Sequence, residues 1–221
     1  MEIVRMPGTA WLVYESGRGI LIDAGMQADG GAVLKRIRAL KVRVPLIFLT
    51  HTHYDHTGGV EALRSALGAK VLVGENEAAC LREGFTPVPK GVNAFSRFLS
   101  HAAHSVQSKT REHYAPVTEN IVEAGETGTL EGFGFDARYY HLGAHSAGSV
   151  GLQIGETFFA GDTVFGIGVG AYPPFADFKE EISTAWQTII ESGAKYICPG
   201  HGRIIKAEAL KREYTRRFGA I

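Results

Sequence analysis

Three histidines and an aspartate lie within six positions directly after an apolar run, and this cluster constrains the fold more than any other feature of the sequence. Residues 46–49 are Leu-Ile-Phe-Leu, the composition of a buried strand, and residues 51–59 are His-Thr-His-Tyr-Asp-His-Thr-Gly-Gly. A hydrophobic core does not need so many ionisable groups in one place, whereas closely spaced imidazoles and carboxylates are typical metal ligands. The cluster predicts a strand whose end delivers metal ligands to a loop.

Three further candidate ligands occupy similar positions later in the chain. His145, Asp162 and His201 each stand near the end of an apolar stretch with glycine close by. Glycine lets the backbone turn sharply and lets a metal ion approach closely. With the first cluster, these residues make five imidazoles and two carboxylates, whereas a catalytic zinc keeps about three protein ligands and an open position. The sequence therefore predicts two metal ions, and Asp162 is a carboxylate suited to bridging them.

Hydrophobic periodicity predicts a chain of mixed strands and helices. The expected strands are 10–14, 19–23, 46–49, 70–73, 136–141, 150–154, 158–160 and 196–198. The expected helices are 31–40, 58–67, 94–107, 178–192 and 206–218. The chain of 221 residues suits one domain, residues 1–221, with a helical insertion or lid at about 85–117, where Thr-Pro-Val-Pro-Lys at 86–90 breaks the pattern.

Two interpretations of the helix in this insertion remain open. The apolar face of the helix consists of Phe95, Phe98, Leu99, Ala102 and Val106, and the basic and histidine side chains of the segment are Arg97, His101, His104, Lys109, Arg111 and His113. The helix is either a solvated surface element or a cap over the metal cleft. As a cap, its Phe95, Phe98 and Leu99 would contact an apolar part of the substrate, and Arg97 or His104 an anionic part.

Composition and charge exclude several classes of partner. The chain has 45% hydrophobic and 21% charged residues and a formal net charge of zero, which provides no overall field for nucleic acid or an anionic membrane. No apolar stretch approaches the roughly 20 residues that span a bilayer, and residues 1–5 do not resemble a leader peptide. We therefore expect a cytoplasmic protein, with Cys80 and Cys198 as unreactive core thiols.

In the order of these motifs the sequence resembles the metallo-β-lactamase fold superfamily of hydrolases over nearly the whole chain. The matching motifs are Asp23 in Leu-Ile-Asp-Ala-Gly, the His-x-His-x-Asp-His at 51–56, His145 in Gly-Ala-His-Ser, Asp162 in Ala-Gly-Asp-Thr and His201 in Pro-Gly-His-Gly. The resemblance implies an α/β fold, a four-layer αββα sandwich of two mixed β-sheets with helices on the outer faces. The metals would lie in a cleft at one sheet edge.

The resemblance also implies a ligand set of two groups that share a bridge. The implied ligands are His51, His53 and His145 for one metal, Asp55, His56 and His201 for the other, and Asp162 as the bridge. The cofactors would be two divalent ions, zinc first, with iron and manganese as alternatives. Asp23 is either an acceptor for the N–H of a ligand imidazole or an aspartate that forms a turn before Ala24.

The expected reaction is attack by a metal-bridging hydroxide on the carbonyl of a small ester, thioester, lactone or amide. Asp55 would be catalytic, orienting the hydroxide or carrying its proton to the leaving group. Asp162 stands where true metallo-β-lactamases generally have Cys or Ser, which favours the glyoxalase II and lactonase-like branches. The arginine expected shortly after the bridging aspartate in glyoxalases is absent, however, and a loop at 166–170 would instead bring Tyr172 and Phe175 to the substrate.

Two other enzyme classes remain open from the sequence. A mononuclear iron dioxygenase that acts on persulfides uses a related fold. A phosphodiesterase or nuclease would use the same two-metal chemistry, although the chain has no basic stripe that would follow a nucleic-acid backbone. We expect a small-molecule substrate and no nucleic-acid or membrane partner. The oligomeric state is open, with a homodimer compatible with the sequence.

Overall fold

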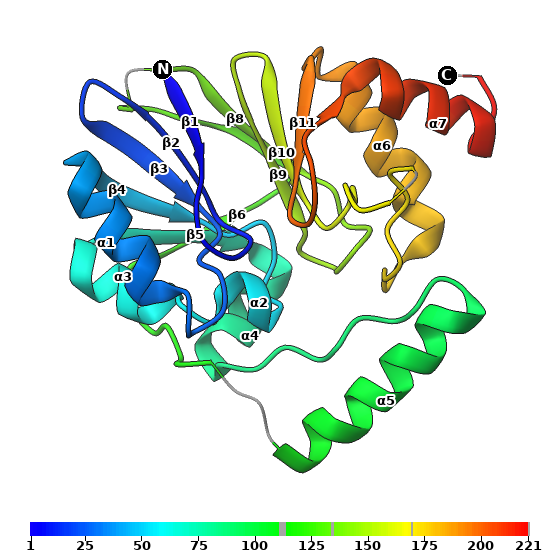
Figure 1. The fold of residues 1–221 in the computed structure, drawn as a ribbon, viewed down its shortest axis with the longest axis horizontal. Coiled ribbons are helices and arrows are strands. Elements are labelled where there is room, and N and C mark those ends of the chain that lie inside the picture. The colour runs from blue at the N-terminus through cyan, green and yellow to red at the C-terminus, as the bar shows by residue number, and fades with distance from the viewer. Residues whose placement is uncertain (111–113, 134, 169, 221) are drawn as a thin grey trace.

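The protein, described here from a computed structural model, has two six-stranded β-sheets packed face to face with helices outside them (Figure 1). The structure describes residues 1–110, 114–133, 135–168 and 170–220, and the side chains of 106–110 are not among the described parts. Arg111 and His113, two of the basic and histidine side chains noted in the insertion, lie outside the described residues. The sandwich predicted from the resemblance is thus present in the structure.

Both sheets are mixed, and each follows the chain with few crossovers. In the first sheet the order is β1-β2-β3-β4-β5-β6, with antiparallel pairing from β1 to β3 and parallel pairing from β3 to β6. In the second the order is β12-β11-β10-β9-β8-β7, with β10 and β11 as its one parallel pair among the described strands. The strands of the first sheet are β1 (Glu2–Arg5), β2 (Trp11–Glu15), β3 (Arg18–Ile22), β4 (Arg43–Phe48), β5 (Lys70–Gly74) and β6 (Ile121–Ala124). The strands of the second sheet are β7 (Thr127–Leu130), β8 (Ala137–His141), β9 (Val150–Ile154), β10 (Thr157–Gly161), β11 (Tyr196–Pro199) and β12 (Ile205–Lys206).

Helices cover the outer face of each sheet. In Figure 1, α1 and α3 lie beside the first sheet, and α6 and α7 lie beside the second. The helices are α1 (Gly30–Leu40), α2 (Tyr54–Thr57), α3 (Val60–Leu67), α4 (Ala78–Glu83), α5 (Ala94–Thr110), α6 (Ile182–Glu191) and α7 (Ala207–Phe218), with short 3-10 turns η1 (Glu75–Glu77) and η2 (Lys179–Glu181).

Alternation of side chains along the strands creates three apolar cores, one at each interface between layers. Successive residues of a strand point to opposite faces of its sheet. In β3, Leu21 packs in the core that includes residues of α1 and α3, whereas Ile20 and Ile22 pack between the two sheets. In β10, Phe159 joins the core between the sheets, and Phe158 packs with residues of α6 and α7. Strands β3 and β10 are therefore apolar on both faces, as central strands of a four-layer fold need to be.

Helix α5 lies outside the four layers, along one edge of the molecule (Figure 1). It corresponds to the helix expected within 85–117, but the four described side chains of its apolar face are solvent-exposed: Phe95 by 71%, Phe98 by 70%, Leu99 by 41%, and Ala102. Among the described helices, none has both the length and the apolar character required to cross a bilayer.

Candidate metal centre

All seven predicted ligands come together, although they come from four separate loops. His51 and His53 follow β4, α2 carries the next two, and the others follow β8, β10 and β11. Within each of three groups the candidate donor atoms lie within 4.8 Å of one another. The groups are His51, His53 and His145; His51, His56 and Asp162; and Asp55, His56 and His201. The first and third groups are the two ligand triads implied by the resemblance, and the second connects them through Asp162.

Hydrogen bonds from outside the cluster fix which nitrogen of a histidine ring faces inward. Nδ1 of His145 lies 2.9 Å from the carbonyl oxygen of Phe175, to which it can donate. Nδ1 of His51 lies 3.1 Å from the hydroxyl of Thr50. Occupying Nδ1 in this way leaves the Nε2 lone pair of each ring directed into the cluster, which is how outer partners orient metal-binding imidazoles.

Asp23 performs the same role for His56. One carboxylate oxygen of Asp23 lies 2.8 Å from Nδ1 of His56, and the other accepts a hydrogen bond of 2.8 Å from the backbone N–H of Thr50. The predicted contact with the N–H of a candidate ligand is therefore confirmed. The backbone of Asp23 is also left-handed, with φ of 57°, a conformation that aspartate tolerates better than most residues. Both sequence interpretations of Asp23 thus describe part of what it does.

Asp162 lies between the two triads. Its Oδ1 is 3.3 Å from Nε2 of His56, and its Oδ2 is 3.4 Å from Nε2 of His201. On the other side of the cluster, Nδ1 of His53 is 2.9 Å from Nε2 of His145. Both of these contacts are to the second triad, while His51 of the first triad has a donor atom within 4.8 Å of the Asp162 carboxylate. The carboxylate therefore lies close to nitrogens of both triads.

Electrostatics keep two of the histidines neutral. Burial lowers the pKa of His51 well below its usual value, and burial together with His145 lowers the pKa of His53 to about 3. Neutral imidazole is the form that binds metal ions.

The pKa of His56 moves the other way. Burial lowers this pKa, but the charges of Asp23 and then Asp162 outweigh burial and raise it well above the usual value. The carboxylates at the centre of the cluster therefore require a nearby positive charge, which a proton on His56 provides and a metal cation would also provide.

The residues present fit a metal site. Among the described residues, four buried side-chain polar atoms have no hydrogen-bond partner, and three of them are Nε2 of His51, Nε2 of His56 and Oδ1 of Asp162. Leaving a buried polar atom without a partner costs about 1–3 kcal/mol. At Gly200, a Cβ would lie 2.2 Å from Oδ1 of Asp162 and 2.5 Å from the His56 ring, so glycine keeps this space open. A bound cation would be coordinated by these three atoms and would supply the partner that each of them lacks.

Glu77 is a buried carboxylate at the site that the sequence did not reveal. Its Oε2 accepts hydrogen bonds from the backbone N–H of Thr52 at 2.6 Å and from the Thr52 hydroxyl at 2.7 Å, and its Oε1 accepts the N–H of Gly148 at 3.3 Å. Thr52 stands between His51 and His53. Glu77 therefore joins the loop that carries these histidines to the loop that follows β8. An isolated glutamate gives no sequence signal for such a role.

Arg5 is a second residue that the sequence did not reveal. Its guanidinium donates to the carbonyl oxygens of Gly200 at 2.8 Å and Pro199 at 3.4 Å, and lies 4.6 Å from the centre of the Trp11 ring. Trp11 also donates from Nε1 to the carbonyl oxygen of Pro199, at 3.3 Å. These contacts from β1 and β2 hold the backbone immediately before His201.

A cleft of about 540 Å³ opens over the candidate ligands. His53, Asp55, His145, Asp162 and His201 line its polar part, and its apolar walls include Val88, Pro89, Leu99, Phe165 and Phe175. A cavity that is polar at one end and apolar along its walls suits a ligand that has an apolar portion and one reactive polar group.

The lining of the cleft corrects two expectations from the sequence. Leu99 and Phe175 line the cleft as predicted. Phe95 and Phe98 do not, because their side chains face solvent. Tyr172 does not line it either, because its ring packs against the core beneath α6 and α7. Helical spacing predicts which residues share one face of a helix, but it does not predict whether that face packs against the protein or is exposed to solvent.

Comparison with known proteins decides the family. A family model described as the metallo-beta-lactamase superfamily matches residues 3–201. The chain belongs to this superfamily. The superfamily membership predicted from the order of the motifs is therefore confirmed.

Named relatives in the superfamily are similar at moderate identity. A beta-lactamase-like protein 2 homolog of Drosophila melanogaster is 27% identical over 211 residues, covering 92% of this chain and 61% of the relative. A hydroxyacylglutathione hydrolase of Methylobacillus flagellatus is 29% identical over 160 residues, covering 72% of this chain and 48% of the relative. An acyl-coenzyme A thioesterase of Gallus gallus is 25% identical over 225 residues, covering 91% of this chain and 75% of the relative. The chain thus spans about half to three fifths of the length of the first two relatives.

Solved structures of the superfamily share the fold. The B3 metallo-beta-lactamase BLEG-1 aligns with a TM-score of 0.74 at 18% identity, covering 99% of both chains. An archaeal superfamily protein from Sulfolobus tokodaii aligns with a TM-score of 0.69 at 19% identity, covering 96% of this chain and 82% of the other. These alignments agree with the two mixed sheets and outer helices described above.

Proposed function

We propose that this protein is a hydrolase that holds two divalent metal ions, zinc in first place, and cleaves a small ester, thioester, lactone or amide. The observation that carries the proposal is the convergence of three buried side-chain atoms that have no hydrogen-bond partner: Nε2 of His51, Nε2 of His56 and Oδ1 of Asp162. Superfamily membership supports it, and so do relatives named as a hydrolase and as a thioesterase. These names favour a thioester as the first substrate to test.

In this proposal each ligand triad holds one ion. His51, His53 and His145 hold the first, Asp55, His56 and His201 hold the second, and Asp162 bridges them. Bound divalent ions lower the pKa of a water molecule from 15.7 to about 7 and polarise a substrate carbonyl, so no serine or cysteine nucleophile is needed.

We assign Asp55 the role of proton carrier. Its side chain is 36% exposed and lines the cleft, and its Oδ2 lies 2.9 Å from Nε2 of His201. A carboxylate at this place can take a proton at Oδ2 and pass it to a leaving group in the cleft. Meanwhile, Leu99, Phe165 and Phe175 exclude water from one side and contact the apolar part of the substrate.

The proposal is tested by elemental analysis of the purified protein together with a substrate panel of thioesters, lactones, β-lactams and phosphodiesters. We expect two divalent metal ions per chain and thioester or lactone hydrolysis that disappears on chelation and returns with zinc. One iron per chain, with oxygen uptake in the presence of glutathione persulfide, would replace the proposal with a dioxygenase. Hydrolysis restricted to phosphodiesters would replace it with a phosphodiesterase.

A further inference from the structure

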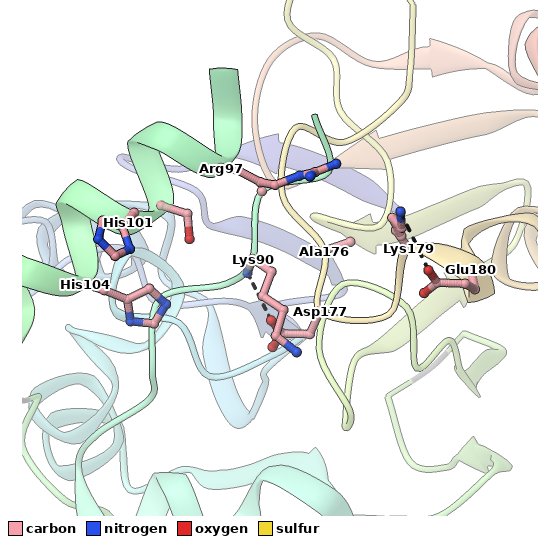
Figure 2. Close-up of a pocket in the computed structure, with 10 residues that line it drawn as sticks. Lys90, Arg97, His101, His104, Ala176, Asp177, Lys179 and Glu180 are labelled. Atoms are coloured by element: carbon pink, nitrogen blue, oxygen red, sulfur yellow. Dashed lines mark hydrogen bonds and ion pairs between the residues drawn. The ribbon is translucent and has the colours of Figure 1, made fainter. Parts of the chain in front are cut away.

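A second cavity, of about 400 Å³, lies beside the metal cleft and has a different character. It is an open depression bordered by solvent-exposed basic and histidine side chains together with Asp177 and Glu180, and we call it the basic pocket after its basic and histidine residues: Lys90, Arg97, His101, His104 and Lys179. Figure 2 shows Arg97, His101 and His104 extending from α5 on one side and Lys179 with Glu180 on the other. The helix that lies outside the sandwich therefore contributes three of the five side chains.

The acidic side chains at this cavity already have partners. Asp177 accepts a hydrogen bond of 3.0 Å from the backbone N–H of Lys90, and Glu180 lies 3.8 Å from the ammonium of Lys179 (Figure 2). Within the described part of the chain, no carboxylate lies within 4.0 Å of the Arg97 guanidinium, and the side chain makes no hydrogen bond there. An arginine at a cavity without an acidic partner is the residue best suited to bind a carboxylate or phosphate, because its planar fork donates two parallel hydrogen bonds.

A short strip of backbone connects the basic pocket to the candidate metal centre. The N–H of Ala176 donates to the carbonyl oxygen of Lys90 at 2.8 Å, and the N–H of Asp177 donates to that of His145 at 2.9 Å. His145 in turn contacts the Phe175 carbonyl oxygen, at 2.9 Å. Residues 175–177 thus border both cavities. Phe175 lines the metal cleft and its carbonyl oxygen contacts His145, whereas Ala176 and Asp177 line the basic pocket.

Helix α5 faces both cavities. Leu99 and Ala103 line the metal cleft, Arg97 and His104 line the basic pocket, and Ser100 lines both. The two cavities therefore share Ser100 as a lining residue, a buried side chain whose hydroxyl donates to the Pro89 carbonyl oxygen at 2.6 Å. A substrate that occupied both cavities would pass over this contact to place its far end beside Arg97.

We propose that the basic pocket binds a carboxylate or phosphate at the far end of the substrate while the scissile carbonyl lies at the metal centre. This inference rests on the proposed function and adds a specificity site to it. The apolar walls of the cleft contact the hydrocarbon part, and Arg97 pairs with the anion. The substrate class is an ester or thioester with a terminal negative charge, carried either on the acyl side or on the leaving group.

Turnover of matched substrates tests the specificity site. Four thioesters are compared: the acetyl thioester of mercaptohexanoic acid, the S-methyl thioester of pimelic acid, and the neutral methyl ester of each. We expect Arg97→Ala to lower the charged-to-neutral ratio of kcat/KM by about tenfold for one of the two isomers, because a charge-assisted hydrogen bond contributes about that much. Arg97→Lys should restore part of the ratio, and Arg36→Ala, an exposed arginine on α1, should leave it unchanged. The isomer that responds identifies the charged side of the substrate.

A binding measurement separates failure of this inference from failure of the proposed function. Calorimetry with the S-methyl thioether of mercaptohexanoic acid, which has no cleavable bond, should show binding that weakens with added salt and weakens about tenfold in Arg97→Ala. If this binding is seen but no thioester is hydrolysed, the proposed reaction is wrong and the anion site stands. If wild type and Arg97→Ala bind the thioether equally, or if the ratio of kcat/KM does not change in a protein that hydrolyses thioesters, the anion site is wrong.

Discussion

Among the single residues, Asp162 lies where the two ligand triads meet. We predict that Asp162→Ala removes at least one metal ion per chain and lowers turnover by more than about 100-fold, beyond the range seen when an outer contact is lost. Asp136→Ala, which removes a carboxylate from the turn before β8, is the matched control and should keep full metal content. Elemental analysis and turnover measure both effects. Full activity in Asp162→Ala would remove the basis for a bridging carboxylate.

Asp23 should affect metal affinity without contacting the metal. In Asp23→Asn, an amide can keep the hydrogen bonds from Thr50 only by turning its own N–H donors toward Nδ1 of His56. We predict a loss of metal affinity of about 10- to 100-fold. Competition with a chromogenic chelator measures it, and an unchanged affinity would show that Asp23 serves the turn alone.

The buried thiol Cys198 should be unreactive in the folded protein. Burial raises its pKa to about 12, so at pH 8 it remains protonated, and the thiolate is the nucleophile. Iodoacetamide at pH 8 should therefore leave Cys198 unmodified in the native protein and modify it in denaturant, as mass spectrometry of peptides can show. Rapid native labelling at Cys198 would mean that the second sheet opens readily.

Candidate ligands that share one loop, or that stand at the end of an apolar strand beside glycine, were predictable, and the residues that hold their loops from elsewhere in the fold were not. The 51–56 cluster can be recognised in the sequence because several candidate ligands lie within one loop. Glu77 contacts Thr52 and Gly148, which are 25 and 71 positions away, and Arg5 contacts residues 194 and 195 positions away. A single carboxylate or guanidinium in an ordinary segment gives no pattern that would reveal such distant partners.

At the level of elements, strands with alternating buried apolar residues were the most predictable. The strand expected at 150–154 has the observed bounds, since Val150, Leu152 and Ile154 alternate into the core between the two sheets. Strand β1 was not expected, because it is a half-exposed edge strand. Strand β12 has two residues and exists through pairing with β11, which a local pattern does not encode. The helix expected from 178 begins at Ile182, because η2 precedes it.

Glu77 gives a prediction about how two loops are held together. In Glu77→Gln, the amide replaces one acceptor with a donor, so an N–H of Thr52 or Gly148 loses its partner at a cost of about 1–3 kcal/mol. We predict a fall in Tm of roughly 2–10 °C and weaker metal binding. Glu75→Gln, at an exposed position of the same 3-10 turn, is the control and should change neither. Equal Tm values for the two variants would contradict the role.

For the molecule as a whole, the arrangement of layers followed from the resemblance, while the place of α5 did not. Amphipathic spacing indicates that a helix has an apolar face but does not identify what the face packs against. In α5, Leu99 lines the metal cleft but remains 41% exposed, and Phe95 and Phe98 face solvent without lining the cleft. That the segment acts as a lid over the cleft stays a prediction, as do the metal identity and the ligand roles.

Metal binding should stabilise the whole fold, because the ligands come from both sheets. At about 1,000 times the dissociation constant, a ligand that binds only the folded state adds about 4 kcal/mol. For a chain of this size we predict that chelation lowers Tm by roughly 10 °C and that zinc restores it. Calorimetry in both states measures the shift. Identical Tm values with and without metal would mean that no cation binds Nε2 of His51, Nε2 of His56 and Oδ1 of Asp162.

The contact of Arg5 with the backbone before His201 also bears on when the site can form. During synthesis, a growing chain exposes the 51–56 cluster long before the carbonyls that Arg5 holds have left the ribosome. Until then one donor of the second triad is missing, and the nascent protein offers imidazoles to solution without the geometry that selects an ion. For the proposed metal centre, correct loading therefore follows synthesis of at least residues 1–201.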